Sequence, residues 1–455
     1  MTGRGSRPLP VAYTPVVRGL AIALALGAAF APRSAGAAPI ELERRLDGFW
    51  LFDDVDGSVE SANWFDRDPF LDGYGQVEAG FLAAHPDDSQ FLVIYTTWSL
   101  PAGIGALYQA VANDVEGIGY AHIADLDPVI PAPIFDDTPN SQVQGFLHLN
   151  RWTQYLGGDD GLDDETISLI FGQEFGHAWL AFPYYVDAQG VTRDDLLGRS
   201  DAHWSFYLDS AGSPVEGHAW TDNGDGTFTA AKTELFEFSD LDLYLMGLIG
   251  PDEVAPFFLL TDPTNCVDSA LDDGSCAPTD AFRFEADSYT VTANRQDITI
   301  EQIIAAEGPR IPAAGDAPTE WDVSFLLIKR PDETLSEAEL DSMAAIVDRS
   351  IELFDAQTRG LGRIVNRTAG EPDPPPPPPA TDDGGNGDDS GDGGQAATGA
   401  GTASMSGGTM GGTDGRGAAG DEGGGEDGCG CRTTHSRSVA SLALLTLLCL
   451  RRRRQ

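Results

Sequence analysis

The sequence DDETISLIFGQEFGHAWLAF, from Asp163 to Phe182, carries the strongest structural signal in this chain. Its apolar residues recur at every third or fourth position, as on one face of a helix: Ile167, Phe171, Phe175, Ala178 and Phe182. Acidic residues fill positions 163–165, where a helix N-terminus favours negative charge. We therefore predict an amphipathic helix whose polar side carries Gln173, Glu174 and His177.

This polar side differs at one position from the zinc motif H-E-x-x-H. In that motif two histidines four residues apart bind one Zn²⁺, and the Glu acts as general base on the metal-bound water. Glu174 and His177 occupy the matching positions, but Gln173 replaces the first His. A carboxamide is a poorer zinc ligand than a neutral imidazole. The motif alone is therefore compatible with a weakened zinc site or with the solvated face of an ordinary helix.

Composition excludes one class of partner. The 455 residues have a formal net charge of −45, with 27 Lys and Arg against 72 Asp and Glu. Nucleic-acid binding requires basic side chains that neutralise phosphates, so we expect no nucleic-acid partner. Residues 1–37 combine a basic start, an apolar run and the small-residue site Ala35–Gly36–Ala37, which predicts a secretory signal peptide and an exported protein.

The rest of the chain divides by composition. We expect a main domain over residues 38–250, a smaller C-terminal lobe of the same body over 251–367, and a disordered linker over 368–428. The linker is rich in Pro, Gly and Asp and cannot form a core. Residues 429–455 form a separate tail, in which two Cys precede an apolar stretch and a terminal Arg cluster.

Several segments of the body read as strands and helices. Strands are expected at 91–97, 115–123 and 143–149, before the helix, and again within 282–300 and at 323–328. Further helices are expected at 299–306 and 336–358. This order predicts an α+β fold in which the amphipathic helix packs on a mixed sheet.

Two local features lie beyond the helix. Asn223–Gly226 predicts a hairpin turn rather than a calcium loop, because Lys232 stands where such a loop needs its closing Glu. Cys266 and Cys276 flank an acidic loop, and in an exported protein this spacing predicts a local disulfide.

The chain resembles the zincin metallopeptidases, and more narrowly a group of exported bacterial members. The motifs that carry the resemblance are Gly176–Trp179 (GHAW), Ala202–Ser205 (AHWS) and Leu241–Leu248 (LDLYLMGL). The resemblance covers roughly Phe91 to Ile249. It implies a zincin-like sheet in which an edge strand aligns a peptide substrate above the metal-site helix.

The same resemblance implies roles for individual residues. His177 would be a zinc ligand, Glu174 the general base, and Met246 a residue of the turn that supports the metal site from below. His203 is the best candidate for a further ligand, with a hydrogen-bonded structural His as the alternative. A third ligand would be Gln173 or a nearby Asp among Asp194, Asp195 and Asp201. Tyr244 would donate a hydrogen bond to an oxyanion, unless it is an ordinary core tyrosine.

The C-terminal tail, 429–455, resembles the myxobacterial-type C-terminal sorting tail (MYXO-CTERM). This resemblance implies an envelope sorting machinery as partner, contact with the membrane through the tail, and a place at the cell envelope or outer surface. Two functions follow. The first is a zinc-dependent peptidase acting on peptides or proteins. The second is a degenerate metallopeptidase fold that serves as a surface binding or adhesion module.

Overall fold

The computed structural model describes residues 39–62, 67–101, 104–122, 141–157, 161–233, 235–267, 275–282 and 288–370. The predicted signal peptide and C-terminal tail lie outside these residues, as does the predicted linker from residue 371 onward. Within the described ranges, no helix has both the length and the apolar character that crossing a membrane requires.

The first large sheet has seven strands in the order β1-β2-β14-β3-β5-β4, with β15 also pairing with β14. Their bounds are β1 Ile40–Arg45, β2 Trp50–Asp54, β3 Phe91–Thr96, β4 Leu107–Ala110, β5 Gly145–Arg151, β14 Glu320–Lys329 and β15 Arg363–Asn366. The central strands pair in parallel, whereas β1 and β4 run antiparallel to their neighbours. The prediction of an α+β fold with a mixed sheet is confirmed.

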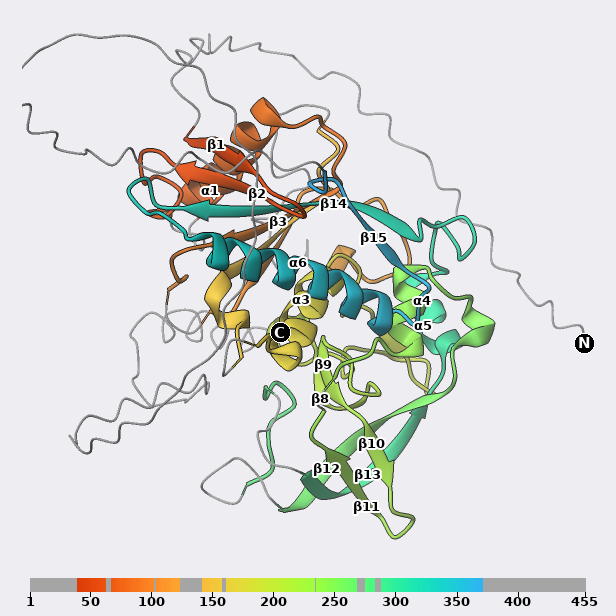
Figure 1. Ribbon diagram of the computed structural model, residues 1–455. Helices are drawn as coiled ribbons and strands as arrows, with labels where there is room; N and C mark the ends of the chain where they lie inside the picture. The colour runs from red at the N-terminus through yellow and green to blue at the C-terminus, as the bar shows by residue number, and fades with distance from the viewer. Residues whose placement is uncertain are drawn as a thin grey trace, which may run out of the picture. The chain divides into compact units, whose positions relative to one another are not determined.

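Helices cover both faces of this sheet (Figure 1). Leu92 and Ile94 of β3 belong to the core formed with α1 (Arg67–Ala84). Phe91 and Val93, which alternate with them, belong to the core formed with α3 (Asp164–Gly176) and α6 (Glu337–Gln357). Because β3 is buried on both faces, its sequence is continuously apolar.

Helix α3 is shorter than predicted. The helix begins at the predicted acidic residues, and Asp163 is its N-cap: the Asp163 carboxylate accepts a hydrogen bond from the Thr166 amide at 3.0 Å. The helix ends at Gly176, however, and His177 takes the C-cap position. The amides of Trp179 and Leu180 both bond to the Gly176 carbonyl, so the chain turns away there, ahead of the helix-incompatible Pro183.

The predictions of single elements met different outcomes. The strands expected at 91–97 and 143–149 are confirmed as β3 and β5, and the one at 323–328 as β14. The strand expected at 115–123 is wrong for its described part, where only Glu116 forms an isolated bridge, to Ile311. Gly117 and Gly119 have φ of 77° and 76°, which breaks an extended conformation.

The second large sheet has six strands in the order β10-β11-β13-β12-β8-β9. The bounds are β8 Trp204–Asp209, β9 Glu216–His218, β10 Trp220–Asp222, β11 Thr227–Ala231, β12 Phe257–Val267 and β13 Ser288–Ile298. The predicted turn at Asn223–Gly226 joins β10 to β11 in an antiparallel hairpin. The predicted disulfide between Cys266 and Cys276 is confirmed, with 5.2 Å between the two Cα atoms.

Residues 251–367, expected as a smaller lobe, contribute to both sheets. Strands β12 and β13 belong to the second sheet, whereas β14 and β15 belong to the first. Strand β14 pairs with β2 on one side and with β3 on the other. The helices expected at 299–306 and 336–358 are confirmed as α5 (Ile300–Glu307) and α6. Helix α6 packs beside α3, with Phe175 and Phe354 ring centroids 4.9 Å apart.

Candidate functional site

Helix α3 and the segment before β8 bring four predicted site residues together. Gln173, Glu174 and His177 come from α3, and His203 directly precedes β8. The Gln173 amide Nε2 lies 3.4 Å from His203 Nε2 and 3.4 Å from Glu174 Oε1. The rings of His177 and His203 meet edge to face, with centroids 4.7 Å apart. The residues that the sequence indicated separately therefore form one polar group, in which Glu174, His177 and His203 are buried and Gln173 is partly buried.

Two further residues, Arg199 and Glu216, complete this group. The Arg199 guanidinium Nη2 donates a hydrogen bond to His203 Nε2 at 2.8 Å, and its Nε donates to Glu216 Oε1 at 2.9 Å. His203 Nδ1 lies 2.8 Å from the Arg199 carbonyl oxygen. A carbonyl can only accept, so Nδ1 carries the proton and Nε2 presents its lone pair to the guanidinium. We call Gln173, Glu174, His177, Arg199, His203 and Glu216 the Arg199 cluster.

Burial sets the charge of the residues on α3. It raises the pKa of the Glu174 carboxyl to about 8, against a smaller opposing effect of the Arg199 charge. Burial also lowers the pKa of the His177 imidazole to about 4. Near pH 7 Glu174 is therefore mostly protonated and His177 neutral. The charges that remain in the cluster are those of Arg199 and Glu216, which pair with each other.

The cluster as arranged does not fit a zinc ion. A catalytic zinc needs three protein ligands with free lone pairs. His203 Nε2 is engaged by the Arg199 guanidinium, and Gln173 stands where the motif has its first His. Among the residues that the structure describes, no three His, Cys, Asp or Glu side chains are grouped closely enough to hold a metal. The cluster in this arrangement therefore offers zinc no complete set of ligands.

The remaining two predicted residues, Tyr244 and Met246, lie in the last turn of α4 (Asp240–Met246), which ends at Gly247 in the left-handed conformation with φ of 84°. Met246 is buried at the end of this helix, in the predicted Tyr-Leu-Met-Gly turn. The buried Tyr244 hydroxyl accepts a hydrogen bond from the Arg310 amide at 3.1 Å. The Arg310 guanidinium donates to the carbonyls of Leu245 and Met246 at 2.8 and 3.0 Å. Tyr244 thus takes part in a structural network around the end of α4.

The sequence analysis did not find Arg199 and Glu216. Arg199 lies four residues before His203 in a short 3₁₀ turn, η3 (Arg199–Asp201), so no helical spacing links the two. Glu216 lies 17 residues after Arg199, and the acids considered as ligands were Asp194, Asp195 and Asp201. The one usable signal was that Glu216 is the first Glu after the A-H-W-S motif.

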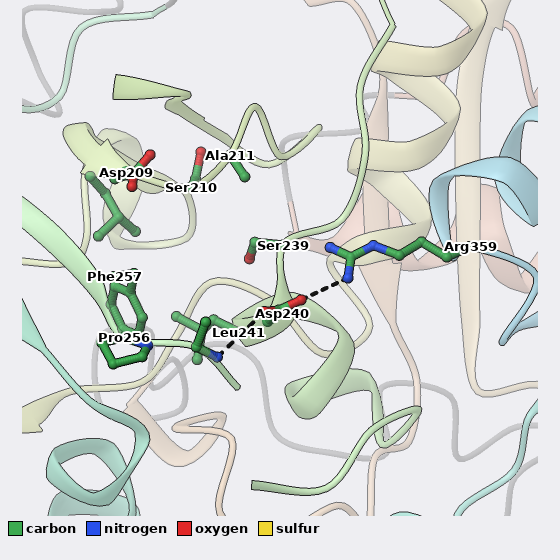
Figure 2. Close-up of a pocket in the computed structure, with 11 residues that line it drawn as sticks. Asp209, Ser210, Ala211, Ser239, Asp240, Leu241, Pro256, Phe257 and Arg359 are labelled. Carbon is green, nitrogen blue, oxygen red and sulfur yellow. Dashed lines mark hydrogen bonds and ion pairs between the residues drawn. The ribbon is translucent and has the colours of Figure 1, made fainter. Parts of the chain in front are cut away.

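A hollow lies elsewhere in the fold, away from the Arg199 cluster, and contains none of the predicted site residues (Figure 2). It has a volume of about 170 Å³ and is bounded by the end of β8, the start of α4, the start of β12 and Arg359. Arg359 pairs with Asp240 at 2.7 Å. Burial raises the pKa of the Asp209 carboxyl in this hollow to about 6, and hydrogen bonds from backbone amides partly oppose the shift.

Comparisons with protein-family models, curated proteins and solved structures gave no match for this chain.

Proposed function

We propose that this protein binds peptides at the edge of its first sheet, beside the Arg199 cluster, without cleaving them. The observation that carries this proposal is the position of β4. Strand β4 pairs with β5 from Leu107–His148 to Ala110–Gly145, and no described strand pairs with its other side. An edge strand can accept an extended peptide as an added strand, and among the described residues the one side-chain hydrogen bond donated to a carbonyl of β4 is that from Gln109 Nε2 to Ala110 at 2.8 Å.

The contacts of α3 support a link between this edge and the cluster. Strand β3 lies over α3, as the 4.9 Å between the Phe91 and Phe175 ring centroids indicates, and β5 and then β4 follow it in the sheet. The Arg199 side chain keeps 38% of its surface exposed, so a bound peptide can reach its guanidinium. Peptide binding needs neither a metal nor a charged base, and it is therefore compatible with a neutral Glu174 and a paired Arg199.

The test uses the full chain and a mixed peptide library. We expect some peptides to bind without being cleaved, as measured by fluorescence polarisation and by mass spectrometry of the recovered peptide. Strand addition uses the peptide backbone, so N-methylation at alternate residues of a bound peptide should abolish binding in one of the two possible registers. Binding that survives both methylation patterns would contradict the edge-strand mode.

A second candidate function is peptide hydrolysis with zinc, the activity that the resemblance implies. It is favoured by the closeness of Glu174, His177 and His203. The decisive comparison is between the parent, Glu174→Ala, Gln173→His, and Gln173→His with Glu174→Ala. Zinc near one per chain and Glu174-dependent cleavage in the parent would establish the peptidase. If the parent cleaves no peptide at any zinc content, the hydrolysis proposal is contradicted and the binding proposal stands.

The envelope location expected from the tail suits a surface binding protein and belongs to the same proposal. Deletion of residues 429–455 should release the protein into the medium with its fold unchanged. Retention of the truncated protein by the cells, measured by fractionation, would contradict the sorting role of the tail.

A further inference from the structure

We infer that the guanidinium of Arg199 replaces a metal ion in this site: it supplies the positive charge between His203 and Glu216 and keeps divalent cations out. The inference rests on the proposed function, because it concerns the same cluster and explains how that cluster can bind without metal chemistry. Its consequence is that removal of one side chain uncovers a latent cation site.

The spacing of the partner atoms carries the first step. His203 Nε2 and Glu216 Oε1 lie 3.6 Å apart. Two ligands of one tetrahedral zinc, each about 2.0–2.1 Å from the metal, lie roughly 3.4 Å apart. These two side chains therefore keep the separation of metal ligands, while the Arg199 guanidinium bonds to both. The Gln173 amide lies beside the same His203 nitrogen, with its Nε2 3.4 Å away, and has to turn before its oxygen, the atom that can bind a metal, faces the site.

The surroundings hold the guanidinium in this position. The Glu216 side chain is only 2% exposed, so its charge needs a fixed partner. On another side, the Phe282 ring centroid lies 5.5 Å from Arg199 Cζ, within reach of a cation–π contact. Both carboxylate and guanidinium are thus placed by the fold as a pair.

The backbone around this pair is strained on both sides. Glu216 has φ of 72°, and Ser200 and Asp201, directly after Arg199, have φ of 60° and 53°. Left-handed conformations are disfavoured for residues other than glycine, and they persist where the surrounding structure imposes them. One of these three residues, Glu216, belongs to the ion pair, and the other two directly follow its partner Arg199 in the chain. The fold therefore maintains the Arg199–Glu216 geometry at a conformational cost.

The charge of Arg199 accounts for the exclusion of metal. A unit positive charge within about 4 Å of a divalent cation raises its free energy strongly even in a partly polar environment. Removal of that charge should tighten zinc binding by roughly 100-fold or more.

The test compares the full chain as parent, Arg199→Ala and Arg199→Lys, with zinc chloride alone as the probe. Zinc binding is measured by calorimetric titration and by thermal unfolding with and without zinc.

We expect the parent to show no zinc-dependent rise in Tm. Arg199→Ala should unfold at a lower temperature without zinc, and zinc should restore much of the lost Tm by binding at about one ion per chain. Adding His203→Ala to this variant should abolish the rescue. Arg199→Lys keeps the positive charge, so its Tm should remain insensitive to zinc. This variant also tests the role of the charge if Arg199→Ala does not fold.

Arg193→Ala is the matched control. Arg193 is 46% exposed and pairs with Asp187, whose side chain is 7% exposed, so this pair resembles Arg199 and Glu216 in burial. No histidine among the residues that the structure describes bonds to this pair, and zinc should not change the Tm of this variant. The inference is overturned if the parent binds zinc through His203, or if Arg199→Ala and Arg193→Ala respond to zinc alike. These assays need no peptide, so a failure of peptide binding leaves their outcome unaffected.

Discussion

Arg199 and Arg310 each lie at the centre of a polar group, but their guanidinium groups bond to different kinds of partner. Arg310 is 4% exposed and donates to the backbone carbonyls of Leu245, Met246 and Pro312. Arg199 is 38% exposed and donates to the side chains of Glu216 and His203. An arginine bonded to fixed carbonyls secures the fold, whereas one bonded to titratable side chains within reach of solvent forms a site.

The largest effect should follow from Arg310→Met. Methionine fills a similar volume but donates no hydrogen bond, so three carbonyls near the end of α4 lose their donor. Leaving buried acceptors without a donor costs about 1–3 kcal/mol each, and we expect a loss of about 3–5 kcal/mol in the free energy of unfolding. Urea denaturation measures it.

Arg359→Met provides the control for this variant. Arg359 is a half-exposed arginine that pairs with Asp240 at the other end of α4 and donates to one backbone carbonyl, that of Phe238, at 3.0 Å. Exposed ion pairs contribute little, and only one carbonyl loses its donor, so the loss should be about 1 kcal/mol. Similar losses for the Arg310 and Arg359 variants would remove the distinction between a structural and an exposed arginine.

Glu216→Gln should have an intermediate effect. The amide oxygen can still accept from Arg199, but the charge of the buried carboxylate is lost, and with it the strength of a charge-assisted bond. Because Arg199 reaches solvent, we expect a loss of about 1–2 kcal/mol in the free energy of unfolding. A loss as large as that of Arg310→Met would mean that the cluster is a structural element like the end of α4.

Asp209→Asn should have an effect of the opposite sign, a stabilisation, and one that depends on pH. Asp209 is a partly buried carboxylate that accepts from the Trp220 amide at 3.1 Å instead of from a guanidinium. Its pKa is raised in the folded protein from 3.8 to about 6. Below about pH 4 both folded and unfolded chains hold this proton, and the group costs nothing. As pH rises toward 6 the unfolded chain loses the proton first, so the native state is progressively destabilised.

The Asn variant removes this cost. Above pH 6 it should be more stable than the parent by about 1–2 kcal/mol, which allows for partial solvent screening of the carboxyl. The difference should disappear below about pH 4. Unfolding curves at several pH values measure it, and a constant difference across the range would show that burial of the charge is not the cause.

The sequence predicted the parts of the fold that depend on local periodicity. The apolar spacing of Ile167, Phe171 and Phe175 predicted α3, and the continuous apolar run at 91–97 predicted the strand that forms β3. The strand expected at 115–123 failed because two glycines adopt positive φ, which hydrophobicity alone does not reveal. The insertion of β14 between β2 and β3 joins segments far apart in the chain and has no local signal.

The candidate site was predictable on α3 but not around it. Gln173, Glu174 and His177 share a helix face, and their closeness follows from the spacing alone. Arg199 and Glu216 meet only because β9 pairs in parallel with β8, with Trp204 opposite Glu216. This pairing, together with the positive φ of Glu216, turns a carboxylate toward the guanidinium. A sequence pattern for metal ligands contains no arginine, so such a pattern could not predict Arg199.

The most direct test of the account is the state of His203 in the intact protein, measured by ¹⁵N NMR of its imidazole, with His203→Gln to assign the signals. We predict a neutral ring protonated at Nδ1, with Nε2 accepting a hydrogen bond from Arg199, and no change when one equivalent of Zn²⁺ is added. A large shift of the Nε2 signal on addition of zinc to the parent would show that this nitrogen binds the metal, and would contradict the central claim that a guanidinium occupies the place of the metal.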